Sequence, residues 1–215
     1  MKTITRRSVL KSLGIAAGVT AGIKTVGLQV AEAAGKWWKP TPQMDAMTAI
    51  RTRRSVRSFT NEDVTDAEVK ELLGAAMSAP SAGNEQPWEF VVIRDKQLLG
   101  EVGKFSKYAG YAKKAPVCVL VCGNLDYDKY DGFWVQDVSA ATQNILLAAH
   151  AMGLGAVWTG AYPEKERVNG FRKLLGIPSK IVPLSLVVIG HPKKQPSPVQ
   201  RFKDDRVHYD GWRSS

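Results

Sequence analysis

The chain alternates between short, continuous apolar runs and longer segments whose apolar residues recur every three or four positions. Short Val- and Ile-rich runs are typical of buried strands, and the longer period is typical of helices. The runs predict strands at 88–93, 115–122 and 181–190, and a strand that passes into a loop at 155–160. The periodic segments predict helices at 44–50, 98–105, 133–152 and 164–175.

One further helix is marked by its first residues. Thr65 and Glu68 form a capping-box pattern, in which each side chain satisfies a backbone N–H of the other residue. The helix should end before Pro80, since proline disfavours helical backbone in the residue before it. Its apolar face comprises Val69, Leu72, Leu73 and Ala76.

The segment 133–152 is rich in Ala and Leu and becomes apolar almost all round toward its C-terminal half, where Gly153 ends it. Such a helix is buried, either in the core or in a seam between two copies of the chain. On this interpretation, His150 within the helix is a packing residue.

Cys118 and Cys122 lie in one predicted strand. Residues four apart on a strand are roughly 13 Å apart, whereas the Cα atoms of a disulfide approach within about 7 Å. Both residues are therefore predicted to be core thiols. No metal site is expected either, because the three histidines are scattered and none pairs with a cysteine at ligand spacing.

With 215 residues, the chain is long enough for one substantial core. Its formal charge is +10, but the segment 1–33 contributes five Lys/Arg and one Glu, which leaves +6 for the remainder. Aromatic residues are not interleaved with the basic ones as in a single-strand binder. Nucleic acid is therefore not expected as a partner.

The N-terminal segment 1–33 resembles a twin-arginine export signal. Arg6 and Arg7 precede a mildly apolar stretch that runs to Val30, and a small-x-small pattern ends at Ala33. The predicted organisation is a signal peptide at 1–33 and a single domain at 34–215, located in the periplasm after passage through the twin-arginine machinery. An uncleaved N-terminal helix or anchor is the alternative.

The segment 51–59 reads RTRRSVRSF and concentrates four arginines and two serines. Arg53 and Arg57 are four apart, so on a helical turn they would share a face with Ser55 between them. Guanidinium groups match phosphate oxygens and the electron-rich edge of a flavin. A solvated basic face is the alternative that the segment alone leaves open.

A polar loop precedes the strand at 88–93. Ser81, Asn84 and Gln86 are polar side chains that can hydrogen-bond the pyrimidine edge of a flavin or its ribityl chain. A plain polar turn remains the alternative.

Four blocks in this order resemble the nitroreductase family of FMN flavoproteins: RRSVR, APSAGNEQPWEF, GLGAVWTGAYP, and VVIGHP followed by Arg201. The resemblance extends from about Met44 to Trp212. It implies an α+β fold with a mixed sheet flanked by helices. It also implies a homodimer with two FMN sites at the subunit interface and a C-terminal segment that crosses onto the partner.

The resemblance also implies roles for individual residues. The arginine block and Arg201 would hold the flavin ring edge, ribityl chain and phosphate. The polar loop would meet the ring edge, and the segment 158–160 would lie against the flavin N5. The implied cofactor-binding residues are Arg53, Arg54, Ser55, Val56, Arg57, Ser81, Asn84, Gln86, Trp158, Thr159, Gly160 and Arg201.

The implied reaction is a two-step reduction of a nitroaromatic, a quinone or a similar electron-poor acceptor. No side chain is placed to act as a nucleophile or general base, so the flavin carries the chemistry. The donor would be NAD(P)H or, for an exported protein, a quinol or redox protein. Alternatives are reductive dehalogenation or flavin fragmentation on the same fold, an exported flavin carrier without catalysis, and a basic interaction protein without cofactor.

Overall fold

The computed structural model describes residues 44–105 and 109–212. The predicted signal sequence, 1–33, lies outside the described residues, as does the beginning of the predicted domain up to residue 43. Within the described part of the chain, no helix is long and apolar enough to cross a membrane.

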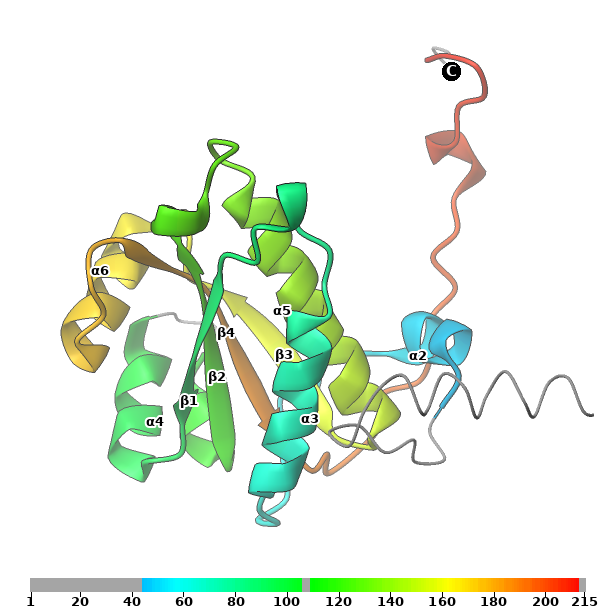
Figure 1. Cartoon of the computed structure of the whole chain (residues 1–215). Helices are drawn as coiled ribbons and strands as arrows, with labels where there is room; N and C mark the ends of the chain where they lie inside the picture. Colours follow the sequence, from blue (N-terminus) through cyan, green and yellow to red (C-terminus); the bar gives the residue numbers. More distant parts are fainter. Residues whose placement is uncertain (1–43, 106–108, 213–215) are drawn as a thin grey trace, which may run out of the picture. The chain divides into compact units, whose positions relative to one another are not determined.

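Four strands form one sheet in the order β1-β2-β4-β3 (Figure 1). Each strand lies within two residues of its predicted position, and the segment predicted to pass from strand to loop is a strand throughout. All three ladders are antiparallel. The strands are β1 (Trp88–Ile93), β2 (Val117–Asn124), β3 (Gly155–Gly160) and β4 (Ile181–Gly190).

Helices cover both faces of this sheet, so the two central strands are buried on both sides. Figure 1 shows α3 (Asp66–Met77) and α5 (Trp134–Ala151) on one face, and α4 (Lys96–Val102) and α6 (Lys165–Leu175) on the other. Odd-numbered residues of β2 pack in the cluster with α3 and α5, and even-numbered ones pack in the cluster with α4 and α6. A strand buried in this way reads as a continuous apolar run.

The alternation in β4 changes halfway along the strand. Val182 and Leu184 belong to the α3/α5 cluster, whereas Leu186 and Val188 belong to the opposite cluster. The register between β2 and β4 shifts at Val121/Cys122, where β4 carries one extra residue. One extra residue reverses which face the following side chains occupy.

The two cysteines are buried free thiols on the α4/α6 face of β2, as predicted. Burial raises the pKa of both thiols, that of Cys122 to about 12. Both therefore stay protonated and behave as small core side chains.

The helix termini follow from local capping. The predicted capping box of α3 is present, with Thr65 and Glu68 bonded reciprocally. The helix α4 begins two residues before its predicted start, because Asp95 caps it by accepting from the N–H of Leu98 at 2.8 Å. The described residues also form 3-10 turns at Ala82–Asn84, Gly103–Phe105, Ala112–Lys114, Leu125–Tyr127 and Asp204–Arg206.

Arg53 and Arg57 do not share the face that a helical turn would have given them. The helix α2 (Ala46–Thr52) ends at Thr52, and Arg53 already has extended backbone angles, with φ −53° and ψ 133°. Ser55 instead forms an isolated parallel bridge with Ala156. This bridge lies outside the named strands, and the four-stranded sheet is antiparallel rather than mixed as expected. Pairing with β3 is the physical reason the arginine segment is extended.

Gly123 offers a test of the core packing. A Cβ atom at Gly123 would lie 2.3 Å from Cε3 of Trp134, a ring that is 7% exposed. We expect Gly123→Ala to lower the free energy of unfolding in urea by about 1–3 kcal/mol, the usual cost of overpacking. Gly100→Ala in α4 is the matched control, because nothing lies within 4 Å of its Cβ position. Equal stability of the two variants would contradict this packing.

Candidate functional site

The arginine segment leaves α2 and runs beside the edge strand β3. The N–H of Val56 donates to the carbonyl of Ala156 at 3.0 Å, and its side chain is 4% exposed. A Cβ atom at Gly155 would lie 2.7 Å from Cγ1 of Val56. A glycine at this position therefore lets the segment lie directly against β3.

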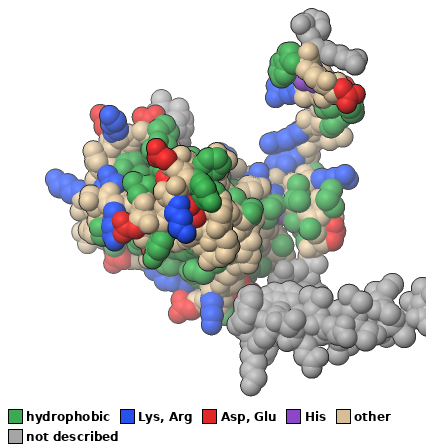
Figure 2. Space-filling view, turned by 45° about the horizontal axis from the view of Figure 1, so that its top comes forward, with side chains coloured by type: hydrophobic (Ala, Val, Ile, Leu, Met, Phe, Trp, Pro, Cys, Tyr) green, Lys and Arg blue, Asp and Glu red, His purple; other side chains and the backbone are tan. Residues whose placement is uncertain are grey.

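The first arginines of this segment meet the C-terminal segment in a pocket of about 700 Å³. We call it the arginine pocket. It is lined by Ile50, Arg51, Thr52, Arg53, Arg54, Pro198, Val199, Gln200, Arg201 and Phe202. Arg54 joins its two walls, because Nη1 donates to the carbonyl of Arg53 at 2.7 Å and Nη2 donates to the carbonyl of Val199 at 3.1 Å. Figure 2 shows basic side chains gathered along the C-terminal segment.

Among the described residues that line the arginine pocket there is no carboxylate, so none of them provides a counter-ion for its guanidinium groups. Burial lowers the pKa of Arg53, and the charges of Arg201 and Arg54 lower it further. Nε of Arg54 is buried and has no hydrogen-bond partner. A bound anion would relieve both the repulsion and the unsatisfied donor.

His150 connects α5 to this pocket. Its Nε2 lies 2.8 Å from Oγ1 of Thr52, which itself donates to the carbonyl of Thr48 at 2.6 Å. Because the hydroxyl hydrogen is used there, Oγ1 accepts from an Nε2–H of the imidazole. Burial lowers the pKa of His150, and the charges of Arg53 and Arg54 lower it further. The expected packing residue is therefore also a polar link that fixes the last residue of α2.

The polar loop forms a closed hydrogen-bonded turn. Oγ of Ser81 accepts from the N–H of Gln86, and Nε2 of Gln86 donates to Oδ1 of Asn84, both at 3.0 Å. Asn84 and Gln86 have φ values of 58° and 54°, which are uncommon for residues other than glycine. Asp137 of α5, missed by the sequence analysis, accepts from the N–H of Ala82 at 3.1 Å. The loop lines neither the arginine pocket nor the pocket described below.

The segment 158–160 belongs to β3 and pairs with β4. Thr159 is 7% exposed, and its Oγ1 lies 2.7 Å from the hydroxyl of Tyr111. The carbonyl of Gly160 accepts from Nη1 of Arg167 at 3.1 Å. A Cβ atom at Gly160 would meet only the carbonyl oxygen of Tyr162, at 3.9 Å, so there is space for a side chain here.

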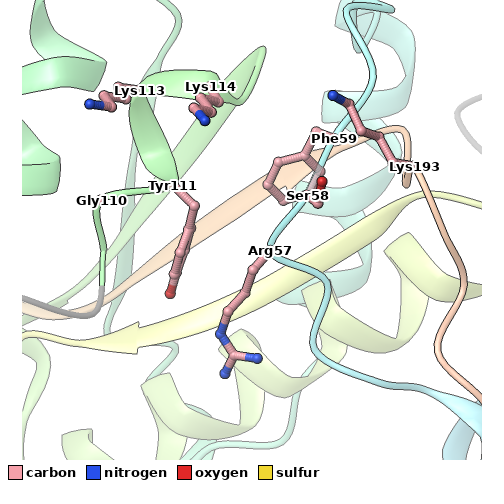
Figure 3. Close-up of a pocket in the computed structure, with 8 residues that line it drawn as sticks. All are labelled: Arg57, Ser58, Phe59, Gly110, Tyr111, Lys113, Lys114 and Lys193. Carbon is pink, nitrogen blue, oxygen red and sulfur yellow. The ribbon is translucent and has the colours of Figure 1, made fainter.

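Arg57 lies in a second pocket of about 370 Å³, which we call the lysine pocket (Figure 3). It is lined by Arg57, Ser58, Phe59, Gly110, Tyr111, Lys113, Lys114 and Lys193. Arg57 and Arg201, both expected to hold the cofactor, thus line different pockets. The role of Tyr111 could not be predicted from the sequence, because its contact with Thr159 joins residues 48 positions apart.

The structure therefore brings Arg53, Arg54 and Arg201 together and separates the other implied cofactor-binding residues from them. Ser55 and Val56 lie beside β3, the segment 158–160 lies in β3, Arg57 lies in the lysine pocket, and the polar loop lies apart. The cofactor roles of all twelve residues stay predictions.

A family model and several known proteins are similar to this chain in sequence. The model of the Nitroreductase family matches residues 50–116 and 107–191. A Methanothermobacter thermautotrophicus protein, provisionally named NADH dehydrogenase/NAD(P)H nitroreductase, is 44% identical over 170 residues, which cover 79% of this chain and 89% of that protein. The FMN reductase [NAD(P)H] of Bacillus subtilis is 26% identical over 183 residues, with 77% and 73% coverage.

Solved structures show the same fold. A provisionally named nitroreductase from Desulfovibrio desulfuricans, in complex with FMN, matches with a TM-score of 0.68 and 32% identity, over 81% of this chain and 99% of that one. The expected α+β fold is thus confirmed. From the family match and these relatives, we conclude that the chain belongs to the nitroreductase family.

Proposed function

We propose that this chain is an FMN-dependent oxidoreductase that transfers electrons from NADH or NADPH to a nitroaromatic or quinone acceptor. The observation that carries the proposal is the arginine pocket, in which the described lining residues include four arginines and no carboxylate. Membership of the nitroreductase family and the names of the relatives support the reaction class. Should the chain be exported, a quinol or redox protein would replace the nicotinamide donor.

The arginine pocket fits the phosphate of FMN. Arg53, Arg54 and Arg201 present charge-assisted donors, and the orphaned Nε of Arg54 can be satisfied by a phosphate oxygen. The pocket volume lies within the range of cofactor sites. His150 holds Thr52 and thereby the start of this arginine run.

When bound, FMN supplies the two-electron redox chemistry, for which side chains have no equivalent. The chain contributes position and space. Val56 holds the arginine segment against β3 through its backbone hydrogen bond to Ala156. Gly160 has no side chain, so a flat ring can approach the backbone there. The hydroxyl of Thr159 is engaged by Tyr111 rather than offered to a substrate.

For a nitro compound, the electrons and protons of the net reaction all come from the donor and the solvent. A nitro group takes up two electrons and two protons and yields a nitroso group and water. NADH or NADPH provides the electron pair and one proton as hydride, and solvent provides the second proton. No side chain therefore has to be consumed or titrated.

A homodimer is part of the proposal. Large apolar side chains stay exposed on α2 and on the C-terminal segment, among them Met47 and Ile50 at 54%, Phe202 at 66% and Trp212 at 85%. Large exposed apolar side chains on neighbouring segments are typical of a subunit interface.

The proposed location is the periplasm, because Arg6, Arg7 and the small-x-small pattern at Ala33 are typical of an exported precursor. We expect the mature protein purified from its native host to begin at Ala34, which N-terminal sequencing of the periplasmic fraction would determine. Intact Met1 protein in the cytoplasm would remove the export proposal and the reason for a quinol donor.

Phosphate recognition is tested by comparing FMN with riboflavin, which lacks the phosphate. We expect Arg53→Gln and Arg201→Gln to weaken FMN binding about ten- to a hundredfold, because a charge-assisted hydrogen bond contributes roughly 1.5–3 kcal/mol. Riboflavin binding should change less than about threefold. Arg57 lies in the lysine pocket, so Arg57→Gln should change the affinities for FMN and riboflavin by the same factor.

Flavin fluorescence titration of purified apoprotein gives these affinities, with Lys70→Gln on the exposed side of α3 as the charge-matched control. Equal losses for FMN and riboflavin in Arg201→Gln would show that the arginine pocket does not hold the phosphate.

Access to the ring is tested at Gly160 and Thr159. We expect Gly160→Val to fold and retain FMN, since its Cβ position is clear of the protein, but to lose acceptor reduction by at least about tenfold, because a branched side chain would block close approach. Thr159→Ala should keep turnover within about tenfold, since its hydroxyl contacts Tyr111. Stopped-flow measurement of both half-reactions checks this. Normal reoxidation in Gly160→Val with a collapse in Thr159→Ala would refute the assignment.

A further inference from the structure

The lysine pocket gathers positively charged side chains from three separate parts of the chain, namely Arg57, Lys113, Lys114 and Lys193. None of the described residues that line the pocket is Asp or Glu. The ion pairs among residues 44–105 and 109–212 use other cations, namely Arg94, Lys104, Lys180 and His191. Four like charges at one cavity repel one another, and an anion in the cavity would reverse the sign of that interaction.

Backbone hydrogen bonds fix the positions of these cations. The N–H of Lys193 donates to the carbonyl of Ser58 at 3.0 Å, and Phe59 pairs with Pro192. On the opposite wall, the N–H of Lys114 donates to the carbonyl of Tyr111 at 3.0 Å within a 3-10 turn. The fold therefore places the three backbone segments around the pocket, and the exposed side chains of the lysines can adjust to a ligand.

One end of the lysine pocket reaches β3. In Figure 3 the side chains of Tyr111 and Arg57 point the same way, and Lys113, Lys114 and Lys193 lie toward the other end. The hydroxyl of Tyr111 contacts buried Thr159 at 2.7 Å. A ligand anchored among the lysines can thus extend along Tyr111 toward the strand that contains Gly160.

We propose that the lysine pocket is a substrate subsite for the anionic group of an aromatic acceptor, so that the enzyme prefers carboxylated over neutral acceptors. This inference rests on the proposed oxidoreductase function. A volume of about 370 Å³ suits a one-ring molecule. The walls match such a ligand, with the ring of Tyr111 for its aromatic part and ammonium groups for its carboxylates.

The test uses FMN-loaded protein and three one-ring nitro compounds that differ in charge. These are meta-nitrobenzyl alcohol, which is neutral, meta-nitrobenzoate, with one negative charge, and nitroisophthalate, with two. We expect the double variant Lys113→Gln/Lys193→Gln to lower kcat/KM about tenfold for nitroisophthalate and about threefold for nitrobenzoate, with the alcohol within about twofold. The same double change at Lys70 and Lys165, exposed on α3 and α6, is the matched control.

A second measurement does not depend on turnover. Isothermal titration of oxidised holoprotein with nitroisophthalate, without any donor, should show binding that weakens about tenfold in the double variant and weakens with added salt. If the wild type reduced none of the three compounds, nitroaromatic acceptors would be excluded from the proposed function, while this titration would still decide the subsite.

Two results would overturn the subsite itself. One is an equal change for neutral and dianionic compounds, because the pocket would then not recognise charge. The other is release of FMN by the double variant, since the lysines would then hold the cofactor and not the acceptor. Unchanged kinetics and unchanged titration in the double variant would also exclude it.

Discussion

The geometry of the site depends on the contact between Val56 and the edge strand β3. One backbone hydrogen bond to Ala156 and a side chain packed over Gly155 hold the arginine segment in an extended conformation. Extension places successive side chains on opposite sides of the segment. Val56 is therefore buried, while its neighbours Ser55 and Arg57 stay accessible. Had the segment remained helical, Arg53 and Arg57 would have shared one face and one ligand.

The division of positive charge between two pockets follows from this extension. Arg53 and Arg54 stay at the end of α2, where the C-terminal segment adds Arg201. Arg57 lies several residues further along and meets the lysines of two other segments. The sequence block that reads as a single basic cluster therefore supplies two chemically distinct sites. One suits the phosphate of a cofactor, and the other suits the acidic group of a smaller molecule.

The sequence predicted the strands, the main helices and the buried thiols because these depend on local periodicity. Strand β2, for example, reads as one apolar run since helices cover both of its sides. The extended path of the arginine segment was not predictable, because a tertiary bridge between Ser55 and Ala156 determines it. The contacts Tyr111–Thr159 and Thr52–His150 were not predictable, because each joins residues distant in the chain and neither has a local pattern.

Helix α5 sets the spacing between two parts of the predicted cofactor site. Near its start, Asp137 fixes the polar loop through Ala82, and near its end, His150 fixes α2 through Thr52. The two attachment points are thirteen residues apart, which corresponds to about 20 Å along a helix. A rigid rod of that length keeps the loop and the arginine pocket of one chain from closing on the same small ligand. In the proposed homodimer, a two-fold axis would give two equivalent sites, each with its own loop and arginine pocket held apart by this helix.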